Sequence, residues 1–147
     1  MLNAFLPQLR AIEQRTKLPF WSDKQIIAGE AWNQAIQSAI DQARIFVLLI
    51  SPHFIDSAYI RDHEWPAIQG RRIADPNNVS VVRVLLSSCD HDLIEASNQA
   101  VPTDPRDGRL KAVNKWRPQG DAYNQARREI MQSMIRFNII PPTTPVV

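Results

Sequence analysis

Residues 21–64 decide the fold of this chain, and the first part reads W-S-D-K-Q-I-I-A-G-E-A-W-N-Q-A-I (21–36). The apolar run I-F-V-L-L-I (45–50) and the segment S-P-H-F-I-D-S-A-Y-I-R-D-H-E (51–64) complete it. The apolar run has no polar alternation, which predicts a parallel strand covered on both faces. Glu64 follows the exit loop of that strand, and α/β sheets bind ligands outside the carboxyl ends of their strands. Glu64 is therefore the first candidate for a functional residue.

Helical and strand patterns alternate on both sides of this stretch. Apolar residues at three- and four-residue spacings predict helices, and short β-branched runs predict strands. We expect helices over residues 2–12, 30–43, 59–69 and 121–134, the third closed by Gly70 and the last capped by Asp121. We expect strands at 18–21, 45–50, 79–86 and 110–114. Such alternation predicts an α/β fold with a doubly wound parallel sheet.

The composition is that of one ordinary globular domain. The chain has 147 residues, of which 44% are hydrophobic and 22% are charged. A single cysteine, Cys89, excludes an internal disulfide and favours a reducing, cytoplasmic location. The longest apolar run, residues 45–50, is far shorter than the roughly 20 residues of a membrane span. We therefore expect no membrane association.

Charge and ligand-like residues favour neither nucleic acid nor metal. Eight of the 17 basic residues lie between Arg106 and Arg136, but acids interrupt them. This pattern is typical of a solvated helix face, so we expect no nucleic-acid partner. The run C-D-H-D (89–92) has no second cysteine or histidine pair to complete a tetrahedral site, so no metal is expected. Four glycines and no G-x-G-x-x-G sequence leave no phosphate cradle of that type.

The whole pattern resembles the TIR (Toll/interleukin-receptor) domain of the bacterial kind. Residues 21–64 match W-x-D-x-x-I-x-x-G-x-x-W followed by S-P-x-F-x-x-S-x-Y-x-x-x-x-E. Residues 81–90 (V-V-R-V-L-L-S-S-C-D) and 100–116 (A-V-P-T-D-P-R-D-G-R-L-K-A-V-N-K-W) are similar to later family motifs. The resemblance implies a flavodoxin-like TIR domain over residues 1–138, followed by a proline-rich tail over 139–147.

One element of that fold has no counterpart after Met1. The central first strand of the family is missing, so we expect it upstream or supplied by another segment or chain. Without it the sheet has exposed inner edges, which favour pairing with another chain. The family also assembles through the loop that corresponds here to residues 22–30. We therefore expect self-association, or contact with other TIR domains.

In TIR enzymes the glutamate matching Glu64 contacts the ribose of NAD⁺ and is required to cleave its bond to nicotinamide. The nicotinamide ring already carries a positive charge and can leave without being protonated. The site then has to stabilise a ribosyl cation, which one carboxylate can do. NAD⁺ is here the substrate, and no cofactor is expected. A helix-start glutamate favoured by the helix dipole is the plainer interpretation of Glu64.

Five further residues are candidates for contact with the nucleotide. Trp21 ends the strand expected at 18–21 and could be either a core residue or a stacking one. Asp23 and Lys24 lie in the loop after it and could contact ribose or phosphate, or belong to an ordinary polar loop. Trp32 begins the apolar stripe of its helix and fits a core position as well as a stacking one. Tyr59 lies next to Ile60, where many TIR enzymes that cleave NAD⁺ carry tryptophan.

Two function classes follow from the resemblance. The first is an NAD⁺ glycohydrolase that releases nicotinamide and ADP-ribose, or a cyclic form, in bacterial defence or signalling. The alternative is a non-catalytic TIR module that assembles by homotypic contacts. Binding of a nucleotide without turnover is a third, weaker option.

Overall fold

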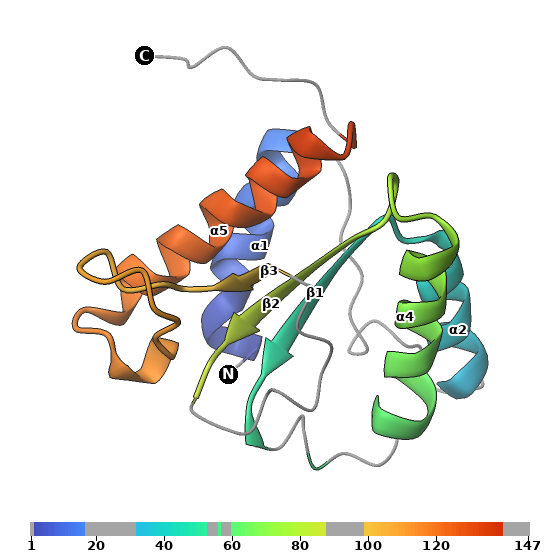
Figure 1. The fold of residues 1–147 in the computed structure, drawn as a ribbon, viewed down its shortest axis with the longest axis horizontal. Coiled ribbons are helices and arrows are strands. Elements are labelled where there is room, and N and C mark those ends of the chain that lie inside the picture. Colours follow the sequence, from blue (N-terminus) through green and yellow to red (C-terminus); the bar gives the residue numbers. More distant parts are fainter. Residues whose placement is uncertain (1, 17–31, 53–55, 57–59, 88–98, 140–147) are drawn as a thin grey trace.

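The structure is a computed structural model that describes residues 2–16, 32–52, 56, 60–87 and 99–139. Within these ranges three parallel strands carry helices on both faces (Figure 1). The strands are β1 (Ile45–Ile50), β2 (Ser80–Leu85) and β3 (Gln99–Val101). The α-helices are α1 (Leu2–Thr16), α2 (Trp32–Gln42), α4 (Trp65–Ala74) and α5 (Gln119–Arg136). Short π and 3-10 helices are η2 (Ile60–Glu64) and η4 (Val113–Lys115).

The described strands lie in the order β1–β2–β3 and all run parallel. β1 pairs with β2 along its whole length, from Ile45 opposite Ser80 to Ile50 opposite Leu85. β3 pairs with the middle of β2, from Gln99 opposite Val82 to Val101 opposite Val84. The expected parallel α/β sheet is confirmed for residues 45–50 and 79–86. The strand expected at 18–21 lies outside the described residues.

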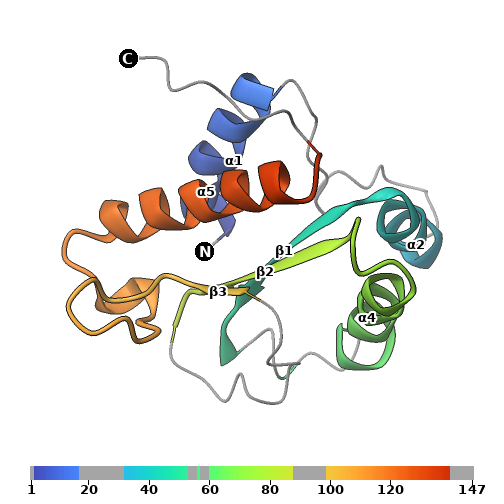
Figure 2. The same cartoon turned by 45° about the horizontal axis from the view of Figure 1, so that its top comes forward.

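Each face of the sheet has its own core, because alternate side chains of a strand point to opposite faces. Val82, Val84 and Leu86 belong to a core with residues of α1 and α5, among them Ile12 and Ile130. Val79, Val81 and Leu85 belong to the opposite core with Ile40 of α2 and Ile68 of α4. Both views show α1 and α5 together on one side, and α2 and α4 together on the other (Figures 1 and 2). Every residue of β2 is buried, as expected for a strand covered on both faces.

Two arginines join neighbouring elements near the amino end of β1. Arg71 of α4 donates from Nη1 to the main-chain oxygens of Ile40 (2.5 Å) and Ala43 (2.7 Å) at the end of α2. Arg44 donates to the oxygen of Phe137 (2.8 Å), directly after α5. The last carbonyls of a helix have no partner within the helix, so these guanidinium groups satisfy oxygens that would otherwise need water.

Three local predictions were wrong. Residues 110–114 do not form a strand: Leu110 makes an isolated antiparallel bridge with Thr103, and η4 follows at 113–115. The helix expected to close at Gly70 continues to Ala74, and a side chain at Gly70 would meet no atom within 4 Å. The last helix begins at Gln119 rather than after Asp121, with Pro118 in the capping position.

Candidate functional site

Glu64 lies where the chain returns to the sheet face after β1. It is the last residue of the π-helical turn η2 and directly precedes α4. Its backbone is helical (φ −72°, ψ −50°), so the π turn runs into α4 without a break. π turns inserted next to α-helices are frequent at functional sites. The plainer interpretation of the sequence was a glutamate at a helix start, and the structure places Glu64 at the π–α junction.

The proline that follows gives a physical reason for the wide turn. Pro66 occupies the second position of α4 and has no N–H to donate to an earlier carbonyl. A proline ring inside a helix also clashes with the carbonyl four residues earlier, which here belongs to Asp62. A π turn over residues 60–64 is wider than an α turn and gives the ring room.

Neighbouring apolar residues hold the Glu64 backbone in place. Trp65 is partly buried against the α2/α4 core, and Ile68, one turn later, belongs to that core. The Glu64 side chain is half-buried and makes no capping hydrogen bond to the first turn of α4. Its carboxylate therefore does not act as an N-cap, which is the usual structural role of an acidic residue at this position.

Of the other predicted site residues, Trp32 lies within the described residues. Trp21, Asp23, Lys24 and Tyr59 lie outside the described residues. Trp32 is the first residue of α2, and α2 packs against both η2 and α4. The structure therefore brings the helix of Trp32 next to the turn of Glu64, while the orientation of the Trp32 side chain is outside the described set.

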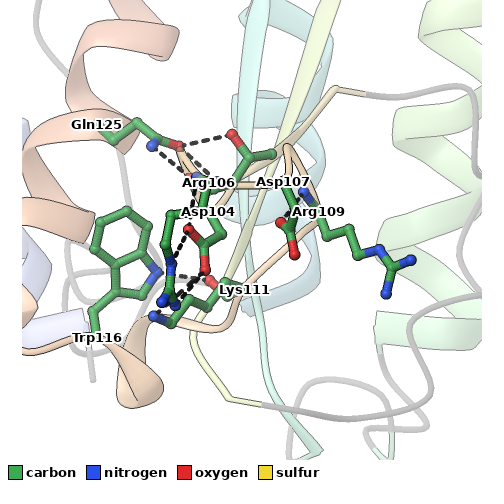
Figure 3. A network of polar contacts seen from close by, with 8 residues as sticks. Asp104, Arg106, Asp107, Arg109, Lys111, Trp116 and Gln125 are labelled. Carbon is green, nitrogen blue, oxygen red and sulfur yellow. Dashed lines mark hydrogen bonds and ion pairs between the residues drawn. The ribbon is translucent and has the colours of Figure 1, made fainter.

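Sequence reasoning missed a polar network in the segment 102–118, which we call the β3–α5 loop (Figure 3). Asp104 is at its centre. Its carboxylate accepts from the main-chain N–H of Arg106 (3.0 Å) and from the Arg106 guanidinium (3.3 and 3.2 Å), and Lys111 Nζ lies 3.8 Å away. These hydrogen bonds hold the pKa of the Asp104 carboxyl below its ordinary 3.8. The bond from the Arg106 side chain has the largest effect, and the bond from the Arg106 main-chain N–H has the second largest.

Helix α5 attaches this loop to the domain. The Gln125 side chain accepts from the N–H of Thr103 (2.6 Å) and donates to its carbonyl oxygen (2.9 Å). The amide therefore pairs with Thr103 as a neighbouring strand would. Gln125 points toward the loop in Figure 3.

The far end of the loop is fixed by Trp116. The indole N–H donates to the oxygen of Lys111 (3.0 Å), and Lys111 Nζ lies 5.3 Å from the centre of the Trp116 ring, a cation–π distance. The sequence marked Asp104-Pro105 and Asp107-Gly108 only as turns. The spacing of Gln125 from Thr103, 22 residues, gave no local signal of the pairing.

The described residues hold neither a metal-binding group nor a membrane-spanning helix. In the ranges given above, no three His, Cys, Asp or Glu residues gather into a group that could hold a metal ion. Among the same residues, no helix is long and apolar enough to cross a membrane.

The parallel sheet covered on both faces defines a doubly wound α/β domain, and Glu64 follows the exit of β1. The family model for TIR domains matches residues 7–132. The chain belongs to the TIR domain family, whose members generally self-associate or bind other TIR domains. The expected α/β, flavodoxin-like TIR fold is confirmed.

A relative is also known among curated proteins. The uncharacterized protein y4lF of Sinorhizobium fredii is 29% identical over 127 residues. The match covers 86% of this chain and 37% of the relative, so the chain spans little more than a third of that protein. No solved structure matches the chain significantly.

Proposed function

We propose that this TIR domain is an NAD⁺ glycohydrolase and that Glu64 is its catalytic carboxylate. The observation that carries the proposal is the position of Glu64: a half-buried side chain at a π–α junction that does not cap the following helix. Family membership supports the same assignment, since the chain belongs to a family used in signalling and defence.

The proposed reaction needs one well-placed anion. The bond between the ribose anomeric carbon and the nicotinamide nitrogen breaks, and nicotinamide leaves as a neutral molecule with the bonding electron pair. The ribosyl group becomes an oxocarbenium-like cation, and Glu64 stabilises its charge. Water then adds to the anomeric carbon and releases a proton, giving ADP-ribose. In the cyclic variant, a nitrogen of the adenine base takes the place of water.

Replacing Glu64 with glutamine tests the role of the charge. Glu64→Gln keeps the shape of the side chain and removes its negative charge. Groups that act by this kind of electrostatic stabilisation are worth about 2.7–4 kcal/mol, or roughly a hundredfold to a thousandfold in rate. The assay is release of nicotinamide from NAD⁺ by the full-length protein at high concentration. We expect kcat to fall by that factor.

The matched control is Asp41→Asn. Asp41 is an exposed carboxylate on α2 that accepts a hydrogen bond from Gln37 (2.9 Å). This variant also loses one negative charge, so its turnover should equal that of the wild type. If the wild type releases no nicotinamide, or Glu64→Gln is as active as Asp41→Asn, the catalytic assignment is wrong. Glu64 is then a structural carboxylate, and the non-catalytic assembly module becomes the better assignment.

A further inference from the structure

Pro66 lies at the junction of η2 and α4, two residues after Glu64. Pro66 is exposed, whereas its neighbours Trp65 and Ala67 pack against the α2/α4 core. The proline ring therefore contributes little to the core, and Pro66 acts on the fold through the main chain. It lacks an N–H donor, and in an α-helix its ring clashes with the carbonyl four residues earlier.

Without Pro66, this part of the chain would favour one continuous α-helix. The spacing of apolar residues predicts a helix over 59–69. The structure instead has a π turn over residues 60–64, and the α-helix begins at Trp65. In a continuous α-helix, the N–H of residue 66 would donate to the carbonyl of Asp62. Proline has no such N–H, so the chain widens into a π turn at this place.

Packing around the junction determines what a change of turn can move. Ile68 is buried in the α2/α4 core and holds α4 in place. Helix α2 contacts both η2 and α4, and Figures 1 and 2 show α2 and α4 side by side. A π turn closes its hydrogen bonds over one residue more than an α turn, and an α-helix advances about 100° per residue. Conversion of the π turn to an α turn would therefore rotate η2, which ends at Glu64, against a fixed α4.

We propose that Pro66 is a positioning residue for the Glu64 carboxylate. By excluding the α turn, Pro66 keeps η2 in its π form and so sets the direction in which the Glu64 side chain leaves the main chain. Pro66 itself touches neither the substrate nor the reacting atoms. Catalytic groups need accurate placement, and a misplacement of about 1 Å can cost roughly a hundredfold in rate. The inference rests on the proposed function, because Pro66 acts in the same reaction through Glu64.

Replacing Pro66 with alanine tests this role. Pro66→Ala supplies the missing N–H and permits the α turn. We expect kcat for nicotinamide release to fall about tenfold to a hundredfold. KM should stay within about twofold of the wild-type value, because Glu64 acts on a charge that develops in the transition state. The midpoint of urea unfolding should stay near that of the wild type, since Pro66 is exposed and alanine favours helices.

A double-mutant cycle and hydrogen exchange identify how the effect reaches the reaction. In a Glu64→Gln background, Pro66→Ala should lower kcat no further, because the carboxylate through which residue 66 acts is already gone. The N–H introduced by Pro66→Ala should exchange slowly with solvent, since in an α turn it donates to the Asp62 carbonyl. The matched control is Pro76→Ala, which replaces an exposed proline in the turn after α4 and should leave kcat unchanged.

The outcomes separate this inference from the enzymatic proposal. If the wild type releases no nicotinamide, the proposed function is wrong, and the role of Pro66 is wrong with it. If Glu64→Gln loses turnover and Pro66→Ala keeps it, the positioning role alone is overturned. The same holds if Pro66→Ala lowers kcat equally in both backgrounds, if its urea midpoint falls together with kcat, or if its new N–H exchanges rapidly. A loss of activity that Pro76→Ala shares would also overturn it.

Discussion

Asp104 shows how one side chain organises a loop of like charges. Its carboxylate accepts from both the main chain and the guanidinium of Arg106, and it lies near the ammonium of Lys111. These contacts favour the charged form, so the pKa of Asp104 in the folded protein lies below 3.8. A depressed pKa of this sort stabilises the fold above the unfolded pKa. That contribution is lost as the pH falls through the folded value.

The two Arg106 contributions can be separated by substitution. Arg106→Ala removes the guanidinium, the largest cause of the shift, and keeps the main-chain N–H, the second largest. We expect the pKa of Asp104 to rise toward 3.8 without reaching it. Lys111→Ala should raise it less, because the effect of that ammonium is coulombic and the smallest. Titration of the Asp104 carboxyl carbon by NMR measures all three values. Equal pKa values in the wild type and Arg106→Ala would contradict this account of the network.

Between elements, a buried pair of serines joins β2 to α5. Ser80 Oγ and Ser133 Oγ lie 2.5 Å apart, and both side chains are buried. Ser133→Ala alone leaves the Ser80 hydroxyl buried without this partner, which costs about 1–3 kcal/mol. Replacing both serines with alanine removes both polar groups, so we expect the double variant to lose less than Ser133→Ala loses. Urea denaturation gives the free energies of unfolding for the cycle.

The sign of the coupling decides the outcome. If the hydroxyls stabilise each other, the double variant is more stable than the sum of the two single losses predicts. Additive losses would mean that the two hydroxyls contribute independently to stability. A control pair eight residues apart on α5, Asn124→Ala with Gln132→Ala, should show no coupling.

Elements with a strong pattern were predictable from the sequence, and elements formed by distant contacts were not. The run 45–50 and the stretch 79–86 are continuous and apolar, and they form the paired strands β1 and β2. β3 has three residues, too few for a period to show. Residues 110–114 contain apolar side chains in a strand-like order. However, Ala112 and Val113 are drawn into opposite cores instead of a strand.

The sequence predicted that Glu64 follows the exit of a buried parallel strand, and the strand is β1. The sequence did not predict the shape of the turn that holds Glu64. The π turn before it, and the absence of a capping bond, depend on how Pro66 fits the preceding turn and on the packing of Trp65. The network around Asp104 depends on Gln125, whose amide is brought to Thr103 only by the folded sheet. Local sequence does not encode such long-range pairs.

At the scale of the whole molecule, the two cores share one sheet. Ile130 belongs to the core on the α1/α5 face, and Ile68 to the core on the α2/α4 face. β2 supplies buried residues to both cores, with Val82 and Val84 on one face and Val81 on the other. Loss of either core exposes one face of β2. Because the other helix layer also packs on β2, we expect unfolding of one layer to destabilise the other.

This shared strand predicts a single cooperative unfolding transition. Ile130→Ala and Ile68→Ala should each cost about 2–5 kcal/mol, because both side chains are buried and the substitution leaves a cavity. Trp116 packs against the first core and Trp65 against the second. With fluorinated tryptophan, each indole gives its own NMR resonance during a urea titration. In both variants, the native signals of Trp65 and Trp116 should disappear at the same, lowered urea concentration.

The contrary outcome is equally specific. If Ile68→Ala lowers the midpoint at Trp65 and leaves that at Trp116 unchanged, the two faces unfold as separate units. A control substitution, Ile73→Ala, removes an isoleucine that is 70% exposed on α4 and should shift neither midpoint appreciably. If Ile68→Ala lowers the urea midpoints at Trp65 and Trp116 equally, the stability of the face that contacts Trp116 depends on packing at α4, on the other face of the sheet.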